Sequence, residues 1–464
     1  MRRLPEDFIA SVERVVGASH VRCDQESLES YGTDALKQGH PADMVVLPGS
    51  TAEVAAISRL CNEIGVALTP RGGGTGYTGG SVPTAGGIVL SMERLNRIVE
   101  IDGPNLLAVV EPNVVTASLQ RAVEDVGLFY PPDPASLNES VIGGNVAECA
   151  GGPRAFKYGT TKRYVLGLEA VLPTGEVIQT GGKSVKNVVG YDLTQLLVGS
   201  EGTLAIITRI TLRLVPKPPT SSTLRAMFPS LNNAIAAVGE MITARVVPAA
   251  LELVDAECLD AIRCGPGAAL VPDGAQALLL IEVDGMPQAV EEEAKRVLRA
   301  CQISGATDVR QAIDAIEREE LWRVRRDLSF TLRELAPLKI NHDVVVPRNR
   351  IPDLFAVIHS LRDEYGLRMP SFGHVGDGNI HVNILVDPAD TAMMNAARTA
   401  ERRLFEEVVK LEGSISGEHG IGFSKAVYLG LELTPETIAL MRRLKQAFDP
   451  NNILNPGKIF SSNV

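Results

Sequence analysis

The chain has 464 residues, of which 45% are hydrophobic and 22% are charged, and its formal net charge is −11. At about 150 residues per domain, this length predicts two or three domains with a well-buried core. The acidic balance argues against a nucleic-acid partner, which would need clustered Lys and Arg, but it is compatible with a local basic pocket for an anionic substrate.

The first half of the chain has the pattern of short strands and helices joined by glycine-rich loops. Amphipathic helices are predicted at residues 5–16, 51–64 (with Thr51 as the cap) and 115–126. Strands are predicted at residues 44–47, 66–70, 87–91, 97–101, 106–111 and 204–215. Residues 164–172 and 176–180 predict a hairpin, and residues 129–161 are predicted to form a long loop.

Residues 216–222 mark the clearest boundary, because three prolines within four residues cannot continue a sheet. Helices are predicted beyond it at residues 231–244, 287–302, 311–334, 350–365, 389–412 and 434–447. Strands are predicted at residues 249–254, 277–284, 338–346, 367–375 and 379–386. This alternation predicts an α+β domain with helices packed on a mostly antiparallel sheet.

The cysteines and the N-terminus indicate the compartment. The six cysteines are scattered and form no Cys-x-x-Cys pair, which argues against an iron–sulfur cluster or a cysteine-rich zinc site. A disulfide framework is not expected at this length. The N-terminus lacks the apolar stretch of a signal peptide, and no apolar run approaches the about 20 residues of a membrane span. We therefore expect a cytoplasmic protein without an integral membrane segment, with any membrane contact peripheral to the inner face.

Three glycine clusters lie within one stretch of the first half, at residues 71–80, 141–152 and 199–203. The first formally matches the dinucleotide fingerprint through Gly74, Gly76 and Gly79. That fingerprint must open a helix, and Pro83 and the glycines around it argue against one here. Such loops instead present arches of backbone N–H groups that bind phosphate. Surface turns are the alternative, but three clusters favour a nucleotide.

Three of the seven histidines lie in two glycine-rich strings, residues 373–383 and 416–422. If the predicted strands at 367–375 and 379–386 are adjacent, the imidazoles of His374 and His381 converge, and Glu418 supplies a third ligand. Two histidines and a carboxylate suit Zn²⁺ with open positions, and Fe²⁺ or Mn²⁺ use the same donors. The alternative is that each histidine caps a turn or pairs with Asp377.

Taken in order, the motifs at residues 70–76, 143–145 and 199–203 resemble the FAD domain of the vanillyl-alcohol oxidase / p-cresol methylhydroxylase (PCMH) superfamily. The C-terminal half resembles its FAD-linked 2-hydroxyacid dehydrogenases, such as glycolate oxidase flavin subunits and D-lactate dehydrogenases. The resemblance implies an α+β fold with a two-lobed PCMH-type FAD-binding domain at residues 1–216. A substrate or cap domain with an antiparallel sheet is expected at residues 217–412. A C-terminal segment at residues 413–464 is expected to carry the metal and base loop and to pack back on the FAD domain.

The resemblance also implies which residues bind FAD. Some superfamily members attach FAD covalently through a histidine, but no histidine occurs here between residues 41 and 341, so non-covalent FAD is expected. Asn455 lies in a C-terminal signature that folds back over the flavin, although a simple helix-terminating loop is the alternative. The implied FAD-lining residues are Arg71, Gly72, Gly73, Gly74, Thr75, Gly76, Gly79, Gly80, Gly143, Gly144, Asn145, Gly151, Gly152, Tyr158, Gly159, Glu201, Gly202 and Asn455.

The family's catalytic positions are matched as well. The resemblance implies that His374, His381 and Glu418 hold the metal, and that Asn383 and His419 contact the substrate. His419 would act as the base, since a histidine can accept a proton near neutral pH.

Two basic residues are candidates for binding the substrate carboxylate. Arg325 matches the family's carboxylate-binding arginine, and a solvated arginine on a helix is the alternative. Lys339 lies two residues before the family's lysine position, where Asn341 stands; a two-residue shift keeps the same strand face. This departure argues against 2-hydroxyglutarate as the substrate.

These observations predict FAD-dependent oxidation of a small D-2-hydroxy acid, glycolate or D-lactate first, to the 2-oxo acid. Hydride would pass to flavin N5, with metal-assisted deprotonation of the hydroxyl. Electrons would leave to an acceptor protein or a quinone, with iron–sulfur and second flavin subunits as candidate partners. The alternatives are a D-2-hydroxyglutarate dehydrogenase, a non-redox flavoenzyme of the alkylglycerone-phosphate synthase type, and a non-catalytic assembly subunit.

Overall fold

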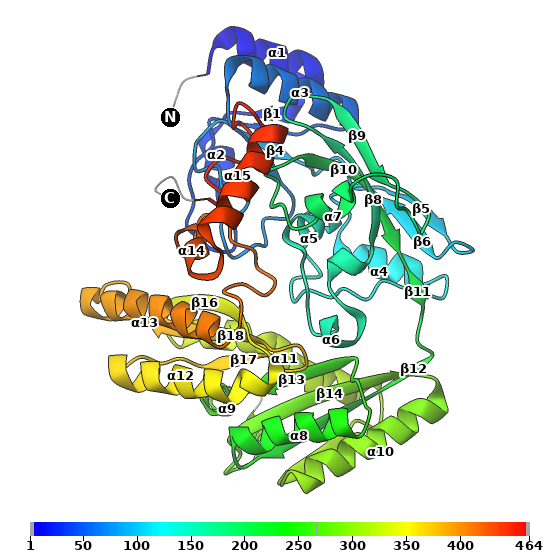
Figure 1. Cartoon of the computed structure of the whole chain (residues 1–464), viewed down its shortest axis with the longest axis vertical. Coiled ribbons are helices and arrows are strands. Elements are labelled where there is room, and N and C mark those ends of the chain that lie inside the picture. Colours follow the sequence, from blue (N-terminus) through cyan, green and yellow to red (C-terminus); the bar gives the residue numbers. More distant parts are fainter. Residues whose placement is uncertain (1–3, 266–267, 461–464) are drawn as a thin grey trace. The chain divides into compact units, whose positions relative to one another are not determined.

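The computed structural model describes residues 4–265 and 268–460, and the chain forms two compact units (Figure 1). Unit 1 contains Met1–Gly151, Thr160–Lys217 and Glu418–Val464, and unit 2 contains Gly152–Gly159 and Pro218–Gly417. Residues 152–159 thus group with unit 2, because Lys157 Nζ and Tyr158 Oη donate to the Asp284 carboxylate at 2.5 and 2.7 Å. Among the described residues, no helix is long and apolar enough to cross a membrane.

The first sheet of unit 1 combines local and distant strands. Its order is β1 (Val21–Arg22), β2 (Met44–Val46), β4 (Ile88–Ser91) and β3 (Leu68–Arg71), and β2, β4 and β3 run parallel. Helices α1 (Glu6–Val16) and α3 (Thr51–Ile64) contribute to a buried core with these strands, and α2 (Gln25–Tyr31) contacts β2.

The cap of α3 differs from the prediction. Ser50, not Thr51, is the cap, because Ser50 Oγ accepts from Glu53 N at 3.2 Å. The Thr51 hydroxyl instead donates to Glu169 Oε1 at 2.7 Å. Both residue types can cap a helix, so the choice depends on this distant partner.

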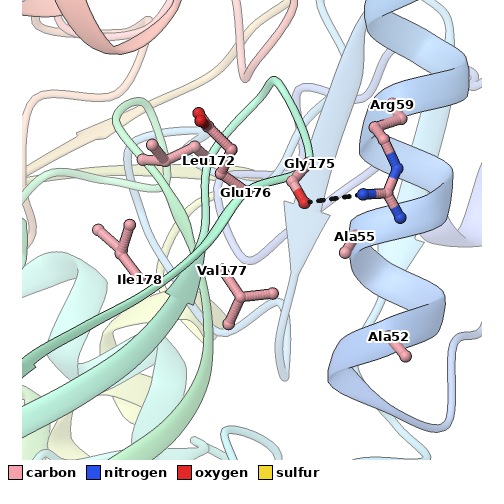
Figure 2. A pocket seen from close by; sticks show the side chains of 8 residues that line it. All are labelled: Ala52, Ala55, Arg59, Leu172, Gly175, Glu176, Val177 and Ile178. Carbon is pink, nitrogen blue, oxygen red and sulfur yellow. Dashed lines mark hydrogen bonds between the residues drawn. The ribbon is translucent and has the colours of Figure 1, made fainter.

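The second sheet of unit 1 is antiparallel. Its order is β5 (Ile98–Asp102), β6 (Leu107–Val110), β10 (Ile206–Arg213), β8 (Val165–Val171) and β9 (Val177–Gly181). The predicted hairpin is confirmed by the β8–β9 register. Figure 2 shows a surface pocket beside its turn, where Arg59 of α3 reaches the Gly175 carbonyl at 3.5 Å. A Cβ at Gly175 would lie 2.7 Å from Ala55 O, so the turn needs glycine there.

The remaining elements of unit 1 surround these sheets. The prediction of one long loop over residues 129–161 was wrong, because α5 forms within it. A Cβ on Gly143 of α5 would lie 2.5 Å from Pro112 Cβ, so close packing outweighs the low helix propensity of glycine. The remaining helices and strands of unit 1 are α4 (Thr116–Glu124), β7 (Leu128–Phe129) paired with β11 (Val215–Pro216), α5 (Ile142–Glu148), α7 (Leu193–Leu197), α14 (Leu429–Glu432) and α15 (Pro435–Phe448).

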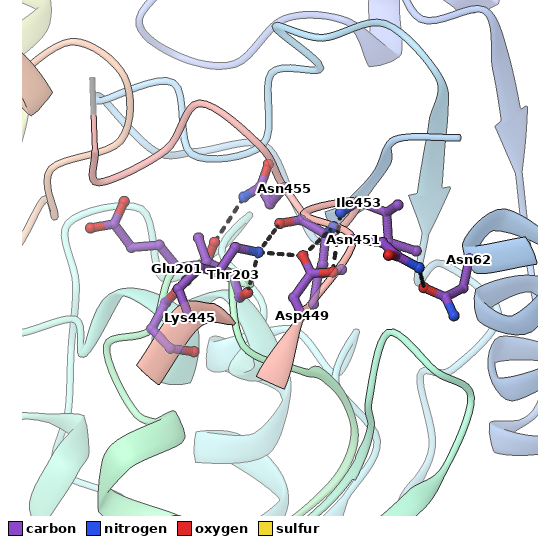
Figure 3. A network of polar contacts seen from close by, with 10 residues as sticks. Asn62, Glu201, Thr203, Lys445, Asp449, Asn451, Ile453 and Asn455 are labelled. Carbon is purple, nitrogen blue, oxygen red and sulfur yellow. Dashed lines mark hydrogen bonds and ion pairs between the residues drawn. The ribbon is translucent and has the colours of Figure 1, made fainter. Parts of the chain in front are cut away.

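The C-terminal segment completes the first sheet. After α15 the chain returns beside β3, where Leu68 N donates to Ile453 O at 2.7 Å. Figure 3 shows how Lys445 holds this return: its Nζ donates to Thr203 O, Asp449 Oδ2 and Leu454 O at 2.5–2.8 Å. The buried Asp449 carboxylate also accepts from Leu454 N at 2.8 Å.

Unit 2 is built on one antiparallel sheet, as predicted. Its order is β15 (Asp308–Gln311), β12 (Thr220–Phe228), β14 (Ala277–Gly285), β13 (Ala250–Val254), β17 (Ser371–His374), β18 (Asn379–Val386) and β16 (Leu338–Val345). The predicted strands omitted β12, which begins inside the proline-rich stretch; its first residues pair with β14 alone. The predicted helix start at residue 311 was wrong, because Asp314 caps α11 (Ala315–Glu334) by accepting from Glu317 N at 2.8 Å.

Helices cover the unit 2 sheet. The pair α8 and α10 packs on β12 and β14, and α13 packs on β16 and β18. Helices α9 and α11 share a core with Phe372 and Leu280. The bounds are α6 (Ala155–Tyr158), α8 (Leu231–Thr243), α9 (Ala256–Arg263), α10 (Pro287–Ile303), α11 (Ala315–Glu334), α12 (Ile351–Tyr365) and α13 (Thr391–Lys410).

Candidate active site

One face of the unit 2 sheet carries a row of polar side chains, which we call the polar face. The strand register pairs Glu252 with His374, Asp343 with His381, and Asn341 with Asn383. Directly paired residues share a face, as do alternate residues of one strand. The polar face therefore includes Glu252, Lys339, Asn341, Asp343, His374, Asn379, His381 and Asn383.

The two predicted metal-ligating histidines meet on this face. The strands β17 and β18 are adjacent across the turn at residues 376–378, which confirms the predicted pairing. The imidazole centroids of His374 and His381 lie 5.2 Å apart and nearly perpendicular, at 88°. Both side chains are almost fully buried, with 4% and 6% of each residue exposed.

Glu252 orients the first of these imidazoles, and the sequence analysis did not identify it. Its Oε1 lies 2.5 Å from His374 Nδ1, and its Oε2 accepts from Arg325 Nε at 2.6 Å. Burial would raise the pKa of Glu252, but its interactions with His374 and Arg325 outweigh burial and lower it to about 2. The available signal was a single carboxylate inside an otherwise apolar strand, since such a group needs a partner.

Arg325 is buried and held by two neighbours. Its guanidinium stacks over the Phe372 ring at 4.3 Å, and Glu252 holds its Nε. No hydrogen bond among the described residues engages its two Nη groups. A guanidinium fixed at Nε keeps its outer fork for a planar carboxylate.

The other predicted substrate residues have partners within unit 2. Lys339 Nζ donates to Ser329 Oγ at 2.6 Å. Burial, with the positive charges of Arg333 and Arg325, lowers the pKa of Lys339 to about 8. Lys339 and Asn341 both lie on the polar face, because residues two positions apart on a strand point to the same side of the sheet.

Asn383 is fully buried and bound on both sides of its amide. Its Nδ2 donates to Pro370 O at 3.0 Å and to His381 O at 3.2 Å. Its Oδ1 accepts from Asn341 Nδ2 at 2.8 Å. The amide therefore fixes the backbone around the second histidine.

Glu418 and His419 lie in a loop at residues 416–422, the base loop, which is anchored at both ends. On the unit 2 side, buried Asp343 accepts from Gly417 N at 2.8 Å through Oδ2. On the unit 1 side, Glu201 accepts from Ile421 N at 2.8 Å and from Gly422 N at 2.6 Å. Glu418 follows Gly417 directly, so the Asp343 anchor fixes where its backbone begins.

Within unit 1, the base loop packs on the first glycine loop. The His419 ring lies 5.2 Å from the Tyr77 ring, and Thr78 Oγ1 donates to His419 O at 2.9 Å. A Cβ on Gly151 would lie 2.6 Å from Glu418 Oε2, so the glycine there admits the carboxylate. The predicted base thus lies beside the predicted FAD loops.

The structure brings the three glycine clusters together. A Cβ on Gly72 would lie 2.6 Å from Val141 Cγ2, and one on Gly202 would lie 2.7 Å from Pro70 Cγ. Around Gly76 the nearest atom to an added Cβ is 4.0 Å away, so this part of the first loop stays open. The clusters therefore form one glycine-lined region of unit 1.

Most of the predicted FAD-lining side chains are hydrogen-bonded to other parts of the chain. Arg71 Nη1 donates to Thr33 O at 2.6 Å, and Asn145 Nδ2 donates to Thr116 Oγ1 at 2.8 Å. Asn455 Nδ2 donates to Gly80 O and to Glu201 O, both at 2.8 Å. In unit 2, Tyr158 bonds Asp284, as described above. Contacts to a ligand would therefore come mainly from the glycine backbones.

The same region contains acceptors that fit a bound nucleotide. Asp34 Oδ2 and Asn455 Oδ1 are buried, and neither has a hydrogen-bond partner among the described residues. Burial raises the pKa of Asp34 to about 6. Hydroxyl donors, such as those on the ribityl chain of FAD, would satisfy such acceptors.

Substituting Gly79 by Ala should destabilise unit 1 by about 2–5 kcal/mol. Gly79 has φ +79°, and an added Cβ would collide with the Phe423 ring. Gly239→Ala is the matched control, because Gly239 lies in α8 with open space around it and should gain about 1 kcal/mol. Chemical denaturation of both variants measures the difference; equal effects would contradict the packing argument.

Comparison with known proteins agrees with this architecture and identifies the chain as a flavoprotein. The FAD binding domain family matches residues 42–181, and the C-terminal domain of FAD linked oxidases matches residues 217–459. The chain belongs to the FAD-linked oxidase family.

Its relatives and structural neighbours span nearly its whole length. The glycolate oxidase subunit GlcD of Bacillus subtilis is 43% identical over 435 residues, covering 94% of this chain and 92% of that protein. The D-lactate dehydrogenase of Archaeoglobus fulgidus is 39% identical over 416 residues, covering 90% and 91%. The structure of p-cresol methylhydroxylase superimposes with a TM-score of 0.83 at 18% identity, covering 99% of this chain and 97% of that one. This confirms the predicted PCMH-type fold.

Proposed function

We propose that this chain uses non-covalent FAD to oxidise a small D-2-hydroxy acid, glycolate or D-lactate first, to the corresponding 2-oxo acid. The observation that carries the proposal is the pair of imidazoles on the polar face together with the Arg325 guanidinium from α11, which is bonded to Glu252 of that face. These groups can bind a metal ion and a carboxylate close together, as a 2-hydroxy acid requires. The names of the Bacillus and Archaeoglobus relatives support the same substrate class.

We further propose that His374, His381 and Glu418 hold a divalent metal, with Zn²⁺ as the first candidate. Two imidazoles and a carboxylate suit this ion and leave positions open for a substrate. The carboxylate of Glu252 behind His374 is the outer-shell partner that metal-binding histidines usually have.

The roles of the chain's own residues follow from these contacts. When bound, FAD supplies the hydride acceptor and the metal lowers the pKa of the substrate hydroxyl. The Arg325 fork, with Lys339, binds the substrate carboxylate. The imidazole of His419 takes the hydroxyl proton on a ring nitrogen. Electrons then leave to a partner protein or a quinone, and the subunit naming of the Bacillus relative supports a multi-subunit assembly.

The test is an anaerobic absorbance spectrum of the FAD-loaded protein with glycolate, D-lactate, D-2-hydroxyglutarate and D-malate. Glycolate or D-lactate should bleach the flavin absorbance. Bleaching by D-2-hydroxyglutarate alone would instead assign the alternative dehydrogenase activity. If none of the four acids reduces the flavin, the proposed oxidation is wrong, and a non-redox flavoenzyme becomes the better assignment.

A further inference from the structure

The buried Glu252 carboxylate uses its two oxygens for two different groups. One oxygen lies 2.5 Å from His374 Nδ1, and the other lies 2.6 Å from Arg325 Nε. Glu252 comes from β13, His374 from the adjacent β17, and Arg325 from helix α11. One side chain therefore joins three elements of unit 2.

Among the described residues, the Glu252 carboxylate makes no hydrogen bond besides these two. Glu252 is fully buried, so water cannot replace either bond. The Arg325 guanidinium is also confined, because it stacks on Phe372, whose ring lies 5.4 Å from the His381 ring. Loss of one oxygen would leave a buried donor unsatisfied, which is costly.

We propose that Glu252 is a positioning residue that couples the two functions of the polar face, metal ligation by His374 and carboxylate binding by Arg325. A proton held on His374 Nδ1 leaves the Nε2 lone pair for a metal. A guanidinium held at Nε keeps both Nη groups for a substrate. The identities of the metal and the substrate rest on the proposed function; the two hydrogen bonds do not.

Glu252→Gln tests the coupling with little change of shape. A glutamine amide can accept from Arg325 Nε only by turning its NH₂ group toward His374, which then moves the histidine proton to Nε2. The affinity of the FAD-loaded protein for Zn²⁺ and Mn²⁺, measured by chelator competition, should fall about 10–100-fold. The KM for the 2-hydroxy acid substrate should rise as well. Glu252→Asp keeps the charge but not the reach, so it should restore one of these two properties at most.

Glu282→Gln is the matched control. Glu282 lies on the neighbouring strand β14 and accepts from Trp322 Nε1 at 3.0 Å and from Thr223 Oγ1 at 2.9 Å. Trp322 belongs to the same helix as Arg325, so both glutamates hold α11. A glutamine oxygen can still accept both of these bonds, so this control removes only the charge of a buried carboxylate beside α11. An equal fall in metal affinity in the two variants would assign the effect to the lost charge, and that result would overturn the proposal.

A third readout needs neither metal nor activity. In protein labelled with ¹⁵N-histidine, an imidazole signal with its proton on Nδ1 should disappear in His374→Gln and change in Glu252→Gln. The similar signal expected from His40, whose Nδ1 lies 3.1 Å from Pro41 O, should stay in both variants. A His374 proton on Nε2 in the wild type would overturn the proposal, whatever the enzyme's substrate. If none of the four acids reduces the flavin, the proposed function is wrong. The ¹⁵N spectrum would still test whether Glu252 positions His374.

Discussion

Replacing His419 by Asn should leave FAD bound and slow substrate-driven flavin reduction by about 10²–10⁴-fold, the usual contribution of a positioned general base. An amide cannot accept the hydroxyl proton near neutral pH, whereas an imidazole can. The base loop should stay in place, because Thr78 bonds the His419 backbone carbonyl and Glu201 bonds the backbone beyond it.

Anaerobic stopped-flow absorbance of the flavin measures this rate. His359→Asn is the control, since His359 is exposed on α12, outside the polar face. It should reduce its flavin at the wild-type rate. A normal rate in the His419 variant would assign the base to another residue, and loss of FAD from it would show that His419 has a structural role instead.

Removing the divalent metal should lower turnover roughly 10³-fold while FAD stays bound, because a Lewis acid contributes several kcal/mol to stabilising the developing charge. Two of the three proposed ligands, His374 and His381, lie in unit 2, whereas the glycine loops lie in unit 1 except for Gly152, so we expect the flavin to stay bound without the metal. Metal content and the flavin spectrum after dialysis against a chelator report the two properties separately.

Adding back Zn²⁺ or Mn²⁺ is the control for this experiment, and recovery of turnover identifies the ion that the site accepts. His381→Ala should reproduce the loss and should not respond to added metal. Full activity in metal-free protein would restrict the His374–His381 pair to a structural role.

The sequence predicted those parts of the site that depend on local pattern. The turn at residues 376–378 between two predicted strands indicated that His374 and His381 converge. The register confirms that the strands are adjacent and places the two histidines diagonally on one face, with His374 opposite Asn379 and His381 opposite Phe372. Glu252 could not be assigned in the same way. Its partners Arg325 and His374 are 73 and 122 residues away along the chain, and only the assembled sheet brings them together.

The glycine motifs predicted which loops come together. They did not predict which groups the polar side chains in these loops contact. Arg71, Asn145 and Asn455 were expected to line the cofactor, and the structure shows each of them bonded to other parts of unit 1. A motif of this kind specifies a backbone shape, and the polar residues in it can be required to keep that shape. Their direct contact with FAD remains a prediction.

The order of segments in the two units has a consequence for how the protein is made. Three segments of unit 1 alternate with two of unit 2, and β3 bonds residues that follow α15. Unit 2 has its whole chain once residue 417 has been synthesised, whereas the core around the first sheet of unit 1 is complete only with Ile453 and Leu454. Since contacts between distant residues slow folding, the unit that begins first on the ribosome is the last to be completed.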